Sequence, residues 1–199
     1  MQQFDSVNIR PSPIAGSWYS ADPLHLRESL SVYLDHAKVP NFSGKIRALI
    51  LPHAGHYYSG QTAAFALKAI EGQQYSRVII LSPSHTYYQD EVLTSAHDAY
   101  QTPLGIVPVD RDSILRISEG LAQKELLLNA IRNDREHAIE IELPFLQLLL
   151  PDGFQLIPLM LMDQRLSTAK TLSEKLTDLI LSFPENEPTL MIASRDLSL

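Results

Sequence analysis

Two apolar runs rich in β-branched residues, at 46–51 and 77–82, dominate the first half of the chain. Because their hydrophobicity is nearly continuous, the pattern predicts strands buried on both faces, as in a parallel sheet. The alanine-rich segment 61–71 between them predicts a helix that ends at Gly72. Together the three segments predict a βαβ unit whose two strands are neighbours.

The second half repeats this alternation. We expect a helix at 138–150, a strand at 155–161, an amphipathic helix at 167–181 and a strand at 189–193. Such an order of elements predicts an α/β protein, a three-layer α/β/α sandwich with a mostly parallel central sheet. No linker or repeat divides the sequence, so we expect residues 1–199 to form a single domain.

Two further segments complete the expected organisation. Asp22 and Pro23 predict the N-cap and first residue of a helix over 23–36. Short strands are expected at 91–96 and 105–109, around a turn at 101–105, as an antiparallel excursion from the sheet.

Composition narrows the possible functions. The chain has a net charge of −7 and no basic run, which argues against nucleic-acid binding. It has no cysteine, so any metal must be held by His, Asp or Glu. No glycine-rich nucleotide loop or nucleophile elbow is present. We find no leader-like segment and no apolar run of 18 residues, and we therefore expect a cytoplasmic protein without a membrane partner.

Two loops place histidines at the carboxyl ends of predicted parallel strands. His53 follows the strand at 46–51, and His85 follows the strand at 77–82. Ligands of open α/β sheets bind beyond this edge of the sheet. If the two strands are neighbours, His53 and His85 lie within reach of a single ion. Taken alone, each histidine is more often a loop residue that forms hydrogen bonds than a metal ligand, and it is the matched placement that favours the pair as ligands.

A third polar segment, 133–146, precedes the predicted apolar helix at 138–150. We take Asp134, Glu136 and His137 as candidate catalytic residues, with Asp134 also a possible helix cap. His137 is expected in the first helical turn, where the helix dipole favours a neutral ring. Glu140 lies three residues further on and is expected on the same face. Glu142 is interpreted as a solvated residue, and Pro144 either interrupts the helix or marks a later start.

Other residues near these loops are candidates for the walls of a pocket. His56 is three residues from His53, a spacing that does not make a dependable chelate within a loop containing glycine. We therefore assign a pocket-lining role to His56, together with Tyr57, Ser84 and Asp196.

Five ordered blocks of the chain resemble the Memo family, also described as AmmeMemoRadiSam system protein B. The blocks lie at 10–19, 52–60 (Pro-His-Ala-Gly-His-Tyr-Tyr-Ser-Gly), 82–85 (Ser-Pro-Ser-His), 102–105 and 136–146. The resemblance implies a fold like that of class III extradiol dioxygenases, which are non-haem iron enzymes. It also implies that His53 and His85 are metal ligands and that His137 lines the same pocket. Ser198 matches the family's third ligand position, and family members continue through further C-terminal elements.

These observations lead to three expected functions. In the first, His53 and His85 bind Fe(II) or Cu, Asp196 or Ser198 completes the site, and His137 transfers protons in redox or oxygen chemistry on a small molecule. In the second, the chain is a non-catalytic module that binds an anionic or peptide ligand in the same cleft. In the third, implied by the family name, it is a partner of radical SAM and AMMECR-type proteins.

Overall fold

The computed structural model describes residues 8–40, 42–132, 135–150 and 153–195 of the chain. Three of the residues singled out from the sequence, Asp134, Asp196 and Ser198, lie outside these ranges. The other candidate site residues all lie within them.

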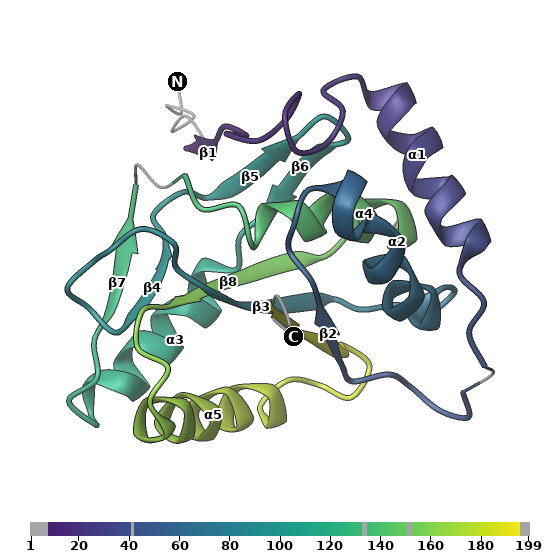
Figure 1. Cartoon of the computed structure of the whole chain (residues 1–199). Helices are drawn as coiled ribbons and strands as arrows, with labels where there is room; N and C mark the ends of the chain where they lie inside the picture. The colour runs from purple at the N-terminus through teal and green to yellow at the C-terminus, as the bar shows by residue number, and fades with distance from the viewer. Residues whose placement is uncertain (1–7, 41, 133–134, 151–152, 196–199) are drawn as a thin grey trace, which may run out of the picture.

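The strands of the larger sheet follow the order β2-β9-β3-β8-β4-β7 (Figure 1). Their bounds are β2 Ala48–Leu51, β9 Thr189–Ser194, β3 Arg77–Pro83, β8 Gln155–Leu161, β4 Val92–Ser95 and β7 Leu128–Ile131. Neighbouring strands pair in parallel, except β8 and β4, which are antiparallel. The predicted α/β class is confirmed.

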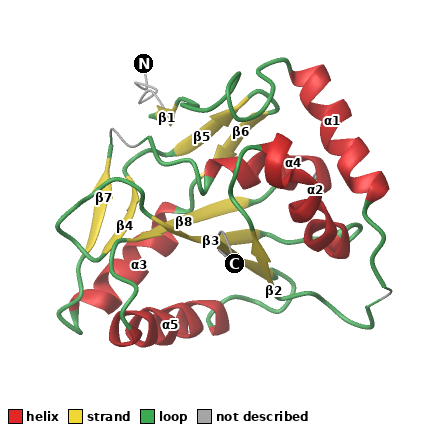
Figure 2. Cartoon of the chain, in the orientation of Figure 1, coloured by secondary structure: helices red, strands yellow, loops and turns green. Residues whose placement is uncertain are grey.

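Helices cover both faces of this sheet (Figure 2). On one side lie α1 (Pro23–His36), α2 (His56–Leu67) and α4 (Leu143–Leu149), and on the other lie α3 (Arg111–Ala122) and α5 (Leu166–Leu181) (Figure 1). Two single 3₁₀ turns, η1 (Lys68–Ile70) and η2 (Glu140–Glu142), extend α2 and precede α4. Because both faces are covered, the consecutive residues Val78, Ile79 and Ile80 of β3 are all fully buried.

A smaller sheet of β1 (Ile9–Arg10), β5 (Ala99–Thr102) and β6 (Gly105–Pro108) lies beside the larger one (Figure 1). β5 and β6 form an antiparallel hairpin around the expected turn, but its first strand, β5, was not predicted. The expected strand at 91–96 does not join that hairpin, because it corresponds to β4 and pairs with β8 and β7 in the larger sheet.

Several predicted elements agree closely with the structure. The helix at 23–36 and the strand at 155–161 have the predicted bounds. The carboxylate of Asp22 accepts a hydrogen bond from the backbone N–H of His25 at 2.8 Å, which confirms it as the N-cap of α1. The elements that were not predicted are β1, β5, α3 and β7.

Two helix starts differ from those predicted. α2 begins at His56 rather than at residue 61, because the carbonyl of Gly55 already accepts from the N–H groups of Tyr58 and Ser59. The helix expected at 138–150 begins only at Leu143, after the turn η2, and Pro144 occupies its first turn. A proline needs no N–H partner there, which explains the later start.

The strand order also corrects the predicted βαβ unit. β2 and β3 are not neighbours, because β9 lies between them and pairs in parallel with both. All three strands nevertheless end at the same edge of the sheet, so the loops after β2 and β3 remain close together.

Candidate metal centre

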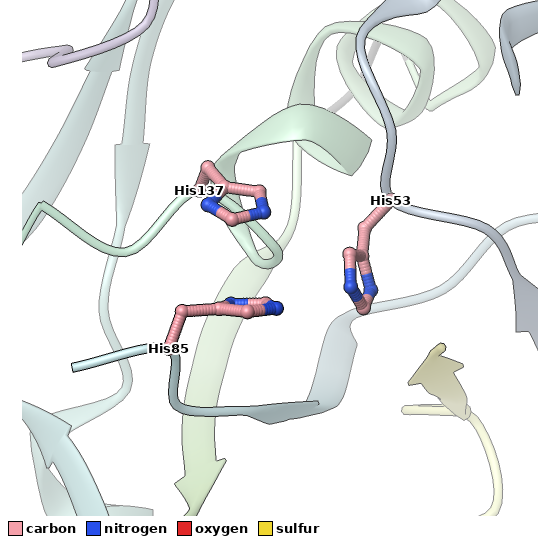
Figure 3. Close-up of side chains that lie close together, drawn as sticks. All are labelled: His53, His85 and His137. Carbon is pink, nitrogen blue, oxygen red and sulfur yellow. The ribbon is translucent and has the colours of Figure 1, made fainter. Parts of the chain in front are cut away.

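Three histidines from distant segments converge at the carboxyl edge of β2, β9 and β3 (Figure 3). His53 follows β2, His85 follows β3, and His137 lies in the loop before η2. Each offers one ring nitrogen, and these nitrogens all lie within 4.8 Å of one another. The rings of His85 and His137 stack with their centroids 4.4 Å apart (Figure 3). The His53 ring lies edge-on to both, with its centroid 5.2 Å from that of His85 and 5.7 Å from that of His137. We call these three residues the histidine trio.

The trio is closed on one side and open on the other. His53 is buried at 3% exposure, whereas the side chain of His85 is 44% exposed and that of His137 is 17% exposed. A ligand can therefore approach from the side of His85.

Glu136 fixes the orientation of His85. One oxygen of its carboxylate accepts from the backbone N–H of His85 at 2.7 Å, and the other lies 2.8 Å from the His85 ring Nδ1. The backbone N–H groups of His137 and Ala138 donate to the same carboxylate at 2.9 and 3.0 Å. An ionised carboxylate only accepts, so Nδ1 of His85 carries a proton, and in the neutral ring Nε2 keeps its lone pair.

Electrostatics support an ionised Glu136. Burial alone would raise the pKa of this carboxyl, since its side chain is only 3% exposed. The backbone N–H donors of His85 and Ala138, and then the His85 ring, outweigh burial and hold the pKa of Glu136 below its ordinary value. Glu136, a catalytic candidate from the sequence, contacts the loop and ring of His85 and the backbone N–H groups of His137 and Ala138.

His53 is held through the last residue of β9. Its ring Nδ1 lies 3.3 Å from the hydroxyl oxygen of Ser194. That hydroxyl also lies 2.7 Å from the carbonyl oxygen of Ala138 and 2.9 Å from the carboxylate of Glu142. Glu142 is 1% exposed, so the interpretation of this residue as solvated was wrong. Its carboxylate contacts Ser194, which lies 52 positions further along the chain.

His137 packs against Trp18, a contact that the sequence did not reveal. The two ring centroids are 4.2 Å apart. The Trp18 carbonyl accepts from the N–H of His56 at 2.9 Å, which ties the N-terminal segment to the start of α2. Trp18 is 36% exposed and so forms part of the surface beside the trio. His137 precedes the helical turn by three residues, rather than lying in the first turn of a helix as expected.

Glu140 does not share a face with His137 as predicted. It is fully buried and accepts from Arg10 at 2.5 Å, from the Tyr19 hydroxyl at 2.7 Å and from the Ser12 hydroxyl. Arg10 is itself 2% exposed and donates to the carbonyl oxygen of Glu136 at 2.7 Å. This ion pair therefore ties the N-terminal segment to the backbone beside the trio.

The three pocket-lining candidates that the structure describes do not share one surface: His56 is buried, Tyr57 is exposed and Ser84 lies in the loop that carries His85. His56 is 6% exposed and packs against Tyr19 and Phe145, with Nε2 2.9 Å from the carbonyl oxygen of Ile141. Tyr57 is 86% exposed on α2. The hydroxyl of Ser84 donates to the carbonyl of Thr86 at 2.8 Å, within the loop that carries His85.

The donor set of the trio suits a transition metal. Imidazole nitrogens bind Zn, Cu, Fe and Ni well, and three protein ligands leave positions open for other molecules. Metal-binding histidines usually donate their second ring N–H to a carboxylate, carbonyl or water. His85 has such a partner in Glu136, and His53 has one in Ser194, so the residues present fit a bound ion.

Comparison with known proteins decides the family. The family model described as "Memo: Memo-like protein" matches residues 10–199. This chain belongs to the Memo family. A MEMO1 family protein of Nitrosopumilus maritimus is 31% identical over 195 residues, which cover 96% of this chain and 68% of that protein.

Other Memo relatives come from distant organisms. The Protein memo-1 homolog of Caenorhabditis elegans is 39% identical over 141 residues, covering 70% of this chain and 39% of that protein. A MEMO1 family protein of Thermotoga maritima is 36% identical over 152 residues, which cover 75% of this chain and 52% of that protein. Within the described ranges of this Memo chain, no helix is both long and apolar enough to cross a membrane.

Proposed function

We propose that this Memo-family chain binds one transition-metal ion, Fe(II) or Cu, through His53, His85 and His137, and acts in redox or oxygen chemistry on a small molecule. The convergence of three imidazole nitrogens within 4.8 Å, with a buried carboxylate on His85, carries this proposal. It assigns His137 as a third ligand, in addition to the two expected from the sequence. Asp196 and Ser198 remain candidates for completing the site.

Each residue around the trio has a definite task in this proposal. Glu136 keeps the His85 proton on Nδ1 and leaves Nε2 for the metal, so it acts through His85 as a positioning residue. Trp18 supplies an apolar wall beside His137. The bound metal would supply Lewis acidity or electron transfer at its open positions. The exposed side of His85 is the route by which a substrate reaches them.

The binding-module alternative uses the same histidines without a metal. An anionic ligand would then meet the ionised Glu136, which lies 2.8 Å from the His85 ring. The negative charge of Glu136 beside the trio disfavours an anionic ligand, and this favours the metal site. Association with radical SAM and AMMECR-type proteins is an expectation from the family resemblance and is compatible with either function.

The test is metal content after anaerobic reconstitution with iron or copper. We expect one ion per chain in the parent and less than a tenth of that in His53→Ala, His85→Ala and His137→Ala. His25→Ala and His36→Ala are matched controls, because both residues are exposed on α1, and they should keep the full amount. A parent without bound metal, or one whose metal survives all three substitutions, would contradict the proposal.

A further inference from the structure

Ser194 occupies a special place in the sheet. It is the last residue of β9, the strand that separates β2 from β3, and so lies between the loops that carry His53 and His85. Its side chain is 2% exposed, and the Glu142 carboxylate that it contacts is 1% exposed. Buried polar groups of this kind are costly unless they form hydrogen bonds.

The hydrogen-bond partners of the Ser194 hydroxyl indicate which ring nitrogen of His53 carries a proton. A serine hydroxyl has one proton and can accept at its lone pairs. The carbonyl of Ala138, at 2.7 Å, can only accept, and the ionised form of Glu142, at 2.9 Å, can also only accept. Once the serine proton is given to either oxygen, the 3.3 Å contact to His53 is a hydrogen bond only if Nδ1 carries a proton. In the neutral ring, Nε2 of His53 is then the unprotonated nitrogen, which is the one that can bind a metal.

We propose that Ser194 and Glu142 are positioning residues that hold His53 in its metal-binding tautomer. The inference rests on the proposed metal site. It makes the supports of the two ligands equivalent: His85 is held by a buried carboxylate directly, and His53 is held by a buried carboxylate through a serine hydroxyl. Loss of such outer partners typically weakens metal binding about 10- to 100-fold.

The first readout needs no metal. Long-range ¹H–¹⁵N correlation spectra of the metal-free protein report which ring nitrogen of each histidine is protonated, and the His53 signals are assigned by their absence in His53→Gln. In the parent, we expect His53 to be protonated on Nδ1. In Ser194→Ala, we expect the Nε2-protonated form to gain population.

The second readout is metal affinity, measured by competition with a chelator. We expect Ser194→Ala and Glu142→Gln to raise Kd about 10- to 100-fold. Ser113→Ala is the matched control, because Ser113 is 3% exposed and bonded to Asp110, away from the trio. It should leave Kd within twofold of the parent. If Ser194→Ala does not fold, Glu142→Gln, which keeps the shape of the side chain, carries both readouts.

The outcomes separate this inference from the proposed function. A parent that binds no metal overturns the proposed function, and the inference with it, whatever the tautomer of His53. A parent that binds metal, with Kd and the His53 tautomer unchanged in Ser194→Ala or Glu142→Gln, overturns the inference alone. An equal loss of affinity in Ser113→Ala would also overturn it, because the effect would then be general destabilisation.

Discussion

Buried carboxylates at the histidine edge of the sheet have separate partners. Glu136 contacts His85, Glu142 contacts Ser194, and Glu140 pairs with Arg10. The first two lie beside the trio, whereas the third anchors the N-terminal segment. Glu136 and Glu140 are each satisfied by several named donors, as burial of a charge requires.

Breaking the Arg10–Glu140 pair is expected to destabilise the fold. Arg10→Met leaves Glu140 buried opposite an apolar side chain, and we expect the free energy of unfolding to fall by about 4 kcal/mol. Chemical denaturation measures this loss. Adding Glu140→Gln should recover part of it, because the uncompensated charge is removed. A loss below about 1 kcal/mol in Arg10→Met, the size typical of an exposed pair, would contradict this role of the buried ion pair.

The stability of the protein should depend on His56 as the pH falls. Burial lowers the pKa of His56 below its ordinary 6.5, against a smaller opposing effect of its bond to Ile141. The unfolded chain therefore takes up this proton first, and the folded state loses stability as the pH falls below about 6.5.

His56→Leu removes this titration, so the stability advantage of the parent over the variant should narrow between pH 7.5 and pH 5.5. Unfolding in denaturant at several pH values provides the comparison. Parallel profiles for the two proteins would show that the His56 pKa is the same in the folded and unfolded states.

The roles of residues that depend on local sequence could be predicted, whereas roles that depend on contacts between distant parts of the chain could not. His53 and His85 were predicted as partners because each follows a predicted strand, which is a local signal. The support of His53 by Ser194 spans 141 positions, and that of Ser194 by Glu142 spans 52. No local pattern reports such contacts, which is why Glu142 was interpreted as a solvated helix residue.

At the scale of elements, the site depends on β9 returning between β2 and β3. The strands themselves were predictable from their apolar runs, since both faces of the sheet are covered. Their order was not, because the apolar pattern of a strand says which faces are buried and not which strand lies beside it. The inserted strand is what brings Ser194 between the two histidine loops.

Two helix caps offer a matched comparison. Asp22 caps α1 on the exposed surface, whereas Asp110 caps α3, is 6% exposed and also pairs with Arg77 at 2.9 Å. We expect Asp22→Ala to lower the free energy of unfolding by about 1 kcal/mol. Asp110→Ala should cost about 3 kcal/mol, because it also removes a charged partner. Equal losses in denaturant unfolding would contradict the role given to the Arg77 pair.

At the scale of the whole molecule, metal binding and folding should be linked. An ion that binds the folded chain at about 100 times its Kd raises the free energy of unfolding by about 2.7 kcal/mol. We expect this gain in the parent and its absence in His85→Ala, as measured by thermal unfolding with and without metal. A gain of the same size in both proteins would place the bound ion elsewhere.

The most direct test of the metal centre is an X-ray absorption spectrum of the metal-loaded protein. The account predicts a shell of nitrogen neighbours at about 2.1 Å, with the outer-shell scattering of three imidazoles. His137→Ala should reduce that imidazole scattering by about a third in whatever metal remains bound, since one of three ligands is removed. A spectrum with only oxygen neighbours, or one unchanged by His53→Ala, His85→Ala and His137→Ala, would contradict the assignment of these histidines as the ligands.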